Sequence, residues 1–308
     1  ICNFNSLINK FNSRYFIHNY KSKNHLWRKI SNYYKMKRYI KNKLFVLGSI
    51  LILLVLIFSI FAPILTKFDP IKIDTDNALQ PMSKDHYFGT DELGRDVYSR
   101  VIYGSRISLY VGFLAAILSG TFGMILGLFA GYYQKFDNVL SRVVDGLLVF
   151  PGLIMAILLV AALGPSINNV IIAMVILYTP QIIRVVRSSV VSVKNEDYVD
   201  AARVVGASDI RILFVHILPN SLAPLIVQVT FGFAWAILVE SGISFLGLGM
   251  PPPNPSWGNI ISDGRNFVYT APWIMFFPGI AISLAVMGLN FIGDGLRDLT
   301  DSRIRHVQ

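Results

Sequence analysis

The sequence predicts an all-α, polytopic membrane protein with six transmembrane helices. Three observations support this prediction. Apolar residues make up 54% of the chain and charged residues only 15%, and the mean hydropathy is +0.54. Several uncharged runs are long enough to cross a bilayer, which takes about 20 helical residues. These runs lack polar alternation, which excludes a membrane barrel, because barrel strands alternate between lipid-facing and lumen-facing residues.

The spans follow one another with one irregularity. The uncharged runs cover residues 44–65, 107–133, 146–183, 212–239 and 266–293. The third run is nearly twice as long as one span requires, and residues 164–169 in its middle form a turn-favouring cluster of Gly, Pro, Ser and Asn. Such a turn would leave peptide groups unpaired in lipid. We therefore divide this run into two spans and expect six crossings.

Basic residues set the orientation. Residues 1–43 hold eleven Lys or Arg and no Asp or Glu, so the positive-inside rule places this N-terminal arm in the cytoplasm. Residues 66–106 hold six basic and seven acidic residues and form the expected extracytoplasmic segment. Six crossings then place the tail, residues 294–308, in the cytoplasm. Between them lies a five-helix core over residues 107–293, in which residues 134–145 and 187–211 face the cytoplasm.

The N-terminal arm has two interpretations. The chain begins with Ile1 and its first methionine is Met36, so we expect translation to start at Met36 and residues 1–35 not to be translated natively. A native, disordered cytoplasmic arm is the alternative. The net charge of +10 resides in this arm, because removing its eleven charges leaves −1. Topology and anionic lipid explain this charge, and we expect no nucleic-acid partner.

Catalytic and metal chemistry have no support in the sequence. Cys2 is the only cysteine, so no thiolate cluster can form within the chain. The histidines are scattered without metal-ligand spacing: His18, His25, His86, His216 and His306. A phosphate-binding loop of the G-x-x-x-x-G-K-S/T type is missing from the sequence. We expect no enzyme activity, no cofactor and no metal site.

A polar segment between the fourth and fifth spans, residues 195–219, is the strongest functional signal. Acceptor side chains just before residue 198 favour a helix that starts there. Ala201 and Ala202 would let a partner surface approach closely, and Gly206 suits a left-handed helix stop. A second helix would then run up to Pro219. The expected product is a helix-turn-helix elbow facing the cytoplasm; an ordinary loop with two surface helices is the alternative.

This segment resembles the coupling loop of ABC importer permeases. In that pattern Glu-Ala-Ala is followed by three residues, Gly, nine residues and Ile-x-Leu-Pro. Matching positions are Ala201, Ala202, Gly206, Leu218 and Pro219, whereas Asp200 stands at the Glu position and His216 at the Ile position. The resemblance implies that these seven residues couple the chain to an ATPase subunit.

A second motif region follows the first span. It resembles the Gly-Thr-Asp, Gly-Arg-Asp and Ser-Arg motifs of C-type permease subunits from dipeptide, oligopeptide and nickel importers. The motif residues are Gly89, Thr90, Asp91, Gly94, Arg95, Asp96, Ser99 and Arg100. Alternating acids and arginines can pair while glycines permit tight turns, which predicts an ordered cap at the outer face; a solvated charged loop is the alternative.

The resemblance covers residues 36–303 and implies a division of labour. A substrate-binding protein outside the membrane would deliver di- or oligopeptides, and this chain and a second homologous permease would form the pathway. Two ATP-binding subunits inside would hydrolyse ATP. The implied location is the plasma membrane of a bacterium. A nickel chelate remains the alternative substrate, and a stand-alone secondary transporter is the alternative class.

Candidate pathway residues are few. Glu240 lies late in the fifth span, and intramembrane carboxylates are costly enough to suggest function, although a structural hydrogen bond is an equal alternative. Trp257 follows a Pro-rich segment, residues 251–256, that is expected to form a strap at the outer mouth, and with Trp273 it fits an interfacial aromatic belt. We expect Arg184 and Arg187 to snorkel to cytoplasmic headgroups.

Overall fold

Helices account for the regular secondary structure of residues 42–300, the part of the chain that the computed structural model describes. The long helices are α2 (Lys43–Ile60), α4 (Val97–Tyr132), α5 (Gln134–Leu148), α6 (Gly152–Leu163), α7 (Ile167–Lys194), α10 (Leu218–Phe245) and α12 (Trp273–Thr300). Shorter helices are α3 (Ala62–Leu65), α8 (Asp197–Val204), α9 (Asp209–Arg211), α11 (Trp257–Gly264), the 3₁₀ turns η1 (Thr75–Asn77) and η3 (Arg265–Phe267), and the π-helical turn η2 (Ile212–Ile217). The predicted start at Met36 and Cys2 lie outside the described residues.

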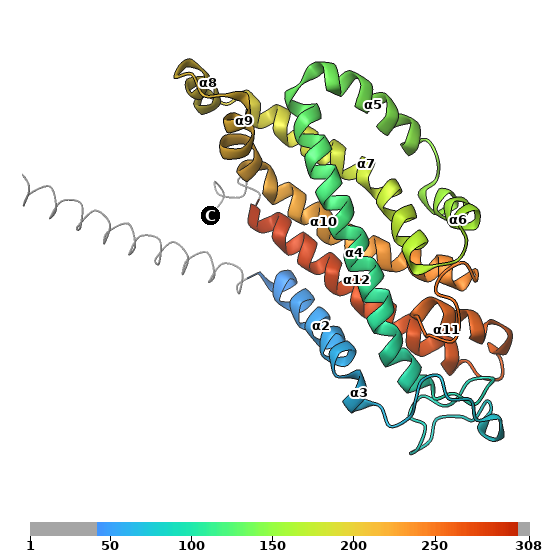
Figure 1. Cartoon of the computed structure of the whole chain (residues 1–308). Coiled ribbons are helices and arrows are strands. Elements are labelled where there is room, and N and C mark those ends of the chain that lie inside the picture. Colours follow the sequence, from blue (N-terminus) through green and yellow to red (C-terminus); the bar gives the residue numbers. More distant parts are fainter. Residues whose placement is uncertain (1–41, 301–308) are drawn as a thin grey trace, which may run out of the picture.

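The long helices form one bundle, with different short segments at its two ends (Figure 1). At one end α8 and α9 project beyond the bundle, and at the other lie α11 and the segment between α3 and α4. Lys194 Nζ donates to the Tyr132 carbonyl oxygen at 2.7 Å, so α4 and α7 both end near α8. Asn42 Nδ2 donates to Asp298 Oδ2 at 3.4 Å, which places the start of α2 beside the end of α12.

Close packing of α4 against α7 forms the centre of the bundle. Gly123, Gly127 and Gly131 lie four residues apart on α4, and a Cβ at any of them would come within 2.5–2.8 Å of an isoleucine or valine side chain of α7. Those α7 side chains are Ile182, Val186 and Val190. Small residues at this spacing let two backbones approach closely, which is how membrane helices gain packing contacts without help from the hydrophobic effect.

The third of the six predicted crossings is built differently from the others. Five helices in the described residues are long and apolar enough to cross a membrane, and the remaining candidate is α5 and α6 together, bent by 89°. At 12 residues, α6 is about 18 Å long and too short to span about 30 Å of hydrocarbon. Pro151 separates the two helices because its ring cannot continue α5. The predicted break at residues 164–169 is present, and Gly164 has a φ of +91°.

Two helix boundaries differ from the ranges read from the sequence. α4 begins at Val97 instead of residue 107, and its 36 residues give a length of about 54 Å, so it extends well beyond the hydrocarbon. The second elbow helix does not end before Pro219. Instead η2 continues directly into α10, because a proline in the first turn of a helix needs no hydrogen-bonded N–H.

Candidate functional site

The elbow, residues 195–219, contains the stop that the sequence predicts. α8 begins at Asp197, and Gly206 follows its end with a φ of +86°. The Gly206 N–H donates to the Arg203 carbonyl at 2.9 Å, and the Ala207 N–H donates to the Ala202 carbonyl at 3.0 Å. This pair of bonds is the Schellman arrangement, in which glycine takes the left-handed position without steric cost. The chain therefore reverses sharply after one short helix.

Buried side chains and polar contacts fix the elbow to the bundle. Val199 of α8 and Ile212 and Ile217 of η2 are fully buried, in one cluster with residues of α4 and α7. The Tyr132 hydroxyl at the end of α4 donates to Asp209 Oδ1 at 2.5 Å. The elbow is therefore packed against α4 and α7 and continues directly into α10.

The outer surface of the elbow exposes apolar side chains. Val204 and Val205 are each 88% exposed and form the tip, and Ile210 is 69% exposed. Beside the tip lies a shallow hollow of about 510 Å³. Its lining includes Tyr198, Ala201, Ala202, Val205, Gly206 and His216. Isolated exposed apolar residues are common, but a contiguous apolar tip on a rigid projection is typical of an interaction surface.

The remaining predicted elbow residues lie around this tip. Asp200 is exposed and accepts a hydrogen bond from Arg203 Nη1 at 2.8 Å. His216 is half-buried, and its carbonyl accepts from Asn220 Nδ2 at 2.7 Å. Leu218 and Pro219 begin α10 and thus belong to the helix behind the elbow. Burial raises the pKa of Tyr198, whose neutral hydroxyl accepts a second bond from Asn220.

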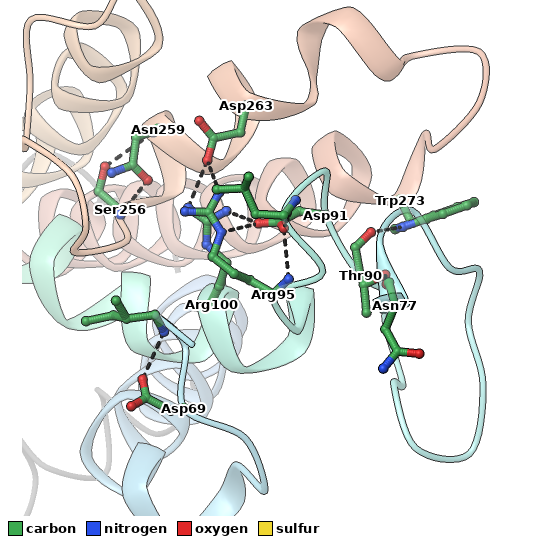
Figure 2. Close-up of polar contacts among 12 residues, drawn as sticks. Asp69, Asn77, Thr90, Asp91, Arg95, Arg100, Ser256, Asn259, Asp263 and Trp273 are labelled. Atoms are coloured by element: carbon green, nitrogen blue, oxygen red, sulfur yellow. Dashed lines mark hydrogen bonds and ion pairs between the residues drawn. The ribbon is translucent and has the colours of Figure 1, made fainter. Parts of the chain in front are cut away.

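The outer cap is centred on a buried carboxylate (Figure 2). Asp91 is fully buried and accepts hydrogen bonds from Arg95 Nε at 2.7 Å and from Arg100 Nη1. Both arginines also donate to Asp263 Oδ2 on α11, at 3.1 Å and 2.9 Å. Two carboxylates and two guanidinium groups thus neutralise one another and join the start of α4 to α11. The predicted ion pairing of this region is confirmed.

Turns and a helix cap complete this network. Asp96 accepts from the Ser99 N–H at 2.8 Å and so caps α4, and its other oxygen lies 2.9 Å from His86 Nδ1. Gly89 and Gly94 both have a φ of +73°. The Thr90 hydroxyl accepts from the Gln80 N–H at 2.8 Å. The charged groups of the cap therefore pair within the chain, although the buried Nε of Arg100 has no hydrogen-bond partner among the described residues.

Sequence reasoning did not identify Asp263. It bridges Arg95 and Arg100 from 168 and 163 residues away, and its local sequence contains none of the motifs that distinguish the cap. Only the packing of α11 against α4 brings it into place. The available signal was charge balance. Two buried arginines beside the single carboxylate of Asp91 require a second acidic side chain.

Glu240 and Trp257 are inside the protein. Glu240 is 2% exposed and accepts hydrogen bonds from Ser108 Oγ at 2.8 Å and Ser244 Oγ at 2.7 Å. Trp257 is 1% exposed and donates from Nε1 to the Val101 carbonyl at 3.0 Å. The structural alternative for Glu240 is therefore supported, and the interfacial belt prediction for Trp257 is wrong because its ring packs beneath α4.

Arg184 and Arg187 each pair with an acidic side chain, and their snorkelling to headgroups stays a prediction. Arg184 Nη2 donates to Asp145 Oδ1 at 2.6 Å, and Arg187 forms a two-bond pair with Asp137, with Nη2 to Oδ2 at 2.6 Å. Both acids belong to α5. These ion pairs join the polar face of α5 to α7. The amphipathic α5 thus has partners for its polar face at the start of the bent third crossing.

Comparisons with known proteins agree with the fold. Residues 123–306 match the family described as "Binding-protein-dependent transport system inner membrane component", and residues 34–81 match "N-terminal TM domain of oligopeptide transport permease C". A dipeptide transport system permease protein of Alkalihalophilus pseudofirmus is 48% identical over 86% of this chain and 88% of its own length. An oligopeptide transport system permease protein of Bacillus subtilis is 41% identical over 88% and 89%.

A solved structure shares the architecture. Inward facing conformations of the MetNI methionine ABC transporter match with a TM-score of 0.56 and 18% identity, over 66% of this chain and 97% of that chain. At this identity the likeness concerns the fold alone. No group of three or more His, Cys, Asp or Glu side chains able to hold a metal ion occurs within residues 42–300.

Proposed function

Because the chain belongs to the family of binding-protein-dependent transport system inner membrane components, we propose that it imports di- or oligopeptides as one half of a heteromeric, ATP-driven permease. The chain is an ABC importer permease, and its family is a family of transport proteins. The names of its relatives support a peptide substrate over the nickel chelate that the sequence left open. Substrate selection would rest largely with an extracytoplasmic binding protein.

The single observation that carries this proposal is the apolar tip on an anchored elbow. Val204 and Val205 are exposed at the far end of a segment whose other side is fully buried. A groove on an ATP-binding subunit would cover the tip and gain roughly 25 cal/mol for each Å² of apolar surface removed from water. Two such subunits, one for each permease half, would draw the elbows together when ATP closes them.

The anchoring of the elbow gives the mechanism. Closure of the ATP-binding subunits would move the tip, and the Tyr132–Asp209 bond with the buried η2 side chains would transmit this displacement to α4 and α10. The two arrangements of the helices would open the pathway alternately to the two sides of the membrane. ATP hydrolysis belongs to the partner subunits, and this chain supplies the lever.

The same proposal orients the molecule. The elbow and the predicted basic arm would lie in the cytoplasm, with both chain ends on that side of a bacterial plasma membrane. The outer cap would then face the extracytoplasmic binding protein. Its ion pairs form within the chain and would hold the start of α4 and α11 together on that side of the membrane.

Uptake measurements test the proposed function. Cells that express the chain with its transporter partners should accumulate a labelled dipeptide, and uptake should stop when ATP is depleted. Collapse of the ion gradients at constant ATP should leave uptake intact. The opposite pattern, dependence on an ion gradient and indifference to ATP, would identify a secondary transporter and refute the proposal.

A further inference from the structure

An exposed polar stripe follows the inner half of α7. Gln181, Arg184 and Ser188 are three and four residues apart, which places them on one helix face, and all three are exposed. Nearer the middle of α7, the exposed residues Ile172 and Ile176 are apolar, whereas the exposed Asn168 lies in the first turn of the helix. The stripe faces away from α4, because α7 meets α4 through Ile182, Val186 and Val190 on its opposite side. The face of α7 that points away from α4 is thus apolar at Ile172 and Ile176 and polar from Gln181 to Ser188.

With the hydrocarbon core centred on α7, Gln181 and Arg184 lie inside its inner edge. α7 has 28 residues and is about 42 Å long, whereas the hydrocarbon core is about 30 Å thick. Gln181 lies 13 residues before the end of α7 at Lys194, and Arg184 lies 10 residues before it, about 15 Å along the axis. A charged side chain at this depth normally faces the interior of a bundle or a water-filled cavity.

The ion pair on this face is open, unlike the pairs in the cap. The side chains of Arg184 and Asp145 are 56% and 65% exposed, although their atoms approach to 2.6 Å. In the cap, the side chains of Arg100 and Asp91 are 2% and 0% exposed. The Asp145–Arg184 pair thus keeps free hydrogen-bonding positions on both partners, which a ligand carrying both charges could use.

We infer that the polar stripe of α7, with Asp145 of α5, lines the water-filled inner half of the translocation pathway and contacts the charged ends of the transported peptide. This inference rests on the proposed function. Arg184 matches a peptide carboxylate and Asp145 matches a peptide ammonium group. Because the two side chains already neutralise each other, the wall carries no net charge when the peptide leaves. The pathway therefore runs past α5 and α7, not past Glu240.

Cysteine labelling tests the inference. In the complete transporter with Cys2→Ser, single cysteines replace Gln181, Ser188 or, as the control on the same helix, Ile176. Inverted membrane vesicles are treated with a charged, membrane-impermeant thiol reagent. We expect Cys at 181 and 188 to react at least about tenfold faster than Cys at 176, because charge enters lipid at high cost. Equally slow reaction at all three positions would overturn the inference and indicate coverage by lipid or by the second permease.

Two further readouts separate the parts of the inference. A saturating dipeptide should slow labelling at 188, and labelling that ignores the peptide would refute the peptide contact. Replacing Arg184 with Gln and Asp145 with Asn together should raise the KM for uptake more than it lowers the maximal rate; a loss of rate at constant KM would also refute this contact. Dipeptide uptake is measured in the same preparation. Absence of uptake in the unsubstituted transporter refutes the proposed function, whereas normal uptake with slow labelling refutes only the inference.

Discussion

The outer cap and the elbow tip satisfy opposite requirements at the two ends of the same bundle. In the cap, strongly polar groups are buried, and Asp91, Arg95, Arg100 and Asp263 pair within the chain. At the elbow, apolar groups are exposed, and Val204 and Val205 lack cover from any described residue.

The outer cap therefore holds two helices of the chain together, whereas the elbow tip has the features of a surface that a partner covers. The ion pairs of the cap form within the chain and stabilise the joint between α4 and α11. An exposed apolar tip on a rigid base gains free energy only when another surface covers it. Substitutions in the cap should therefore lower stability, and substitutions at the tip should lower association.

The largest expected effect is in the cap. Asp91→Asn removes the carboxylate that two buried arginines share and should lower the free energy of unfolding by about 3–5 kcal/mol. The matched control is Asp85→Asn, because Asp85 pairs with Lys67 at 3.2 Å on the surface and such pairs contribute about 0–1 kcal/mol. Thermal unfolding in detergent compares the two variants. Equal melting temperatures would show that the ion pairs of the cap do not stabilise the joint between α4 and α11.

The next effect is in the backbone of the elbow. Gly206→Val places a β-branched residue at a φ of +86°, where the strain is on the order of 1–3 kcal/mol. No other atoms crowd this position, so the expected result is a displaced tip, reduced uptake and normal membrane insertion. Gly279→Val on α12 is the control, since it also meets open space without a positive φ. Normal uptake by the Gly206 variant would contradict the lever.

A smaller effect follows from the tip itself. Changing both Val204 and Val205 to Ser should weaken copurification with the ATP-binding subunit by about tenfold or more, since each buried valine contributes about 1.5 kcal/mol or more. The stability of the isolated permease should change by less than about 0.5 kcal/mol. Tyr269→Ser, at a fully exposed position near the other end, should change neither quantity. A destabilised permease with intact association would reverse the comparison between cap and tip.

The smallest effect is expected at Asp200. Asp200→Lys reverses an exposed charge that pairs only with Arg203, so stability should change by about 0–1 kcal/mol at most. Copurification with the ATP-binding subunit should fall modestly, and it should recover at high salt if the partner residue is basic, because salt screens the repulsion between the two like charges. Unchanged copurification at every salt concentration would remove Asp200 from the interface.

Local patterns predicted the parts of both sites that local chemistry determines. Gly206, the start of α8 and the pairing of Asp91 with Arg95 all depend on residues within a few positions of one another. Asp263 and the burial of Trp257 depend on how α11 packs and were not predictable from spacing. The bent third crossing was missed because hydropathy reports the length of an apolar run, whereas Pro151 and the α5–α7 ion pairs decide its path.

Crosslinking from the tip tests the central claim most directly. A cysteine at Val205, in a chain with Cys2→Ser, is placed in membranes that contain the candidate ATP-binding subunits, and a cysteine at Tyr269 serves as the control at the opposite end. The account predicts a crosslink from position 205 to an ATP-binding subunit, with a yield that changes when ATP binds, and none from position 269. Absence of any crosslink from 205 in a transporter that still imports peptide would contradict the account.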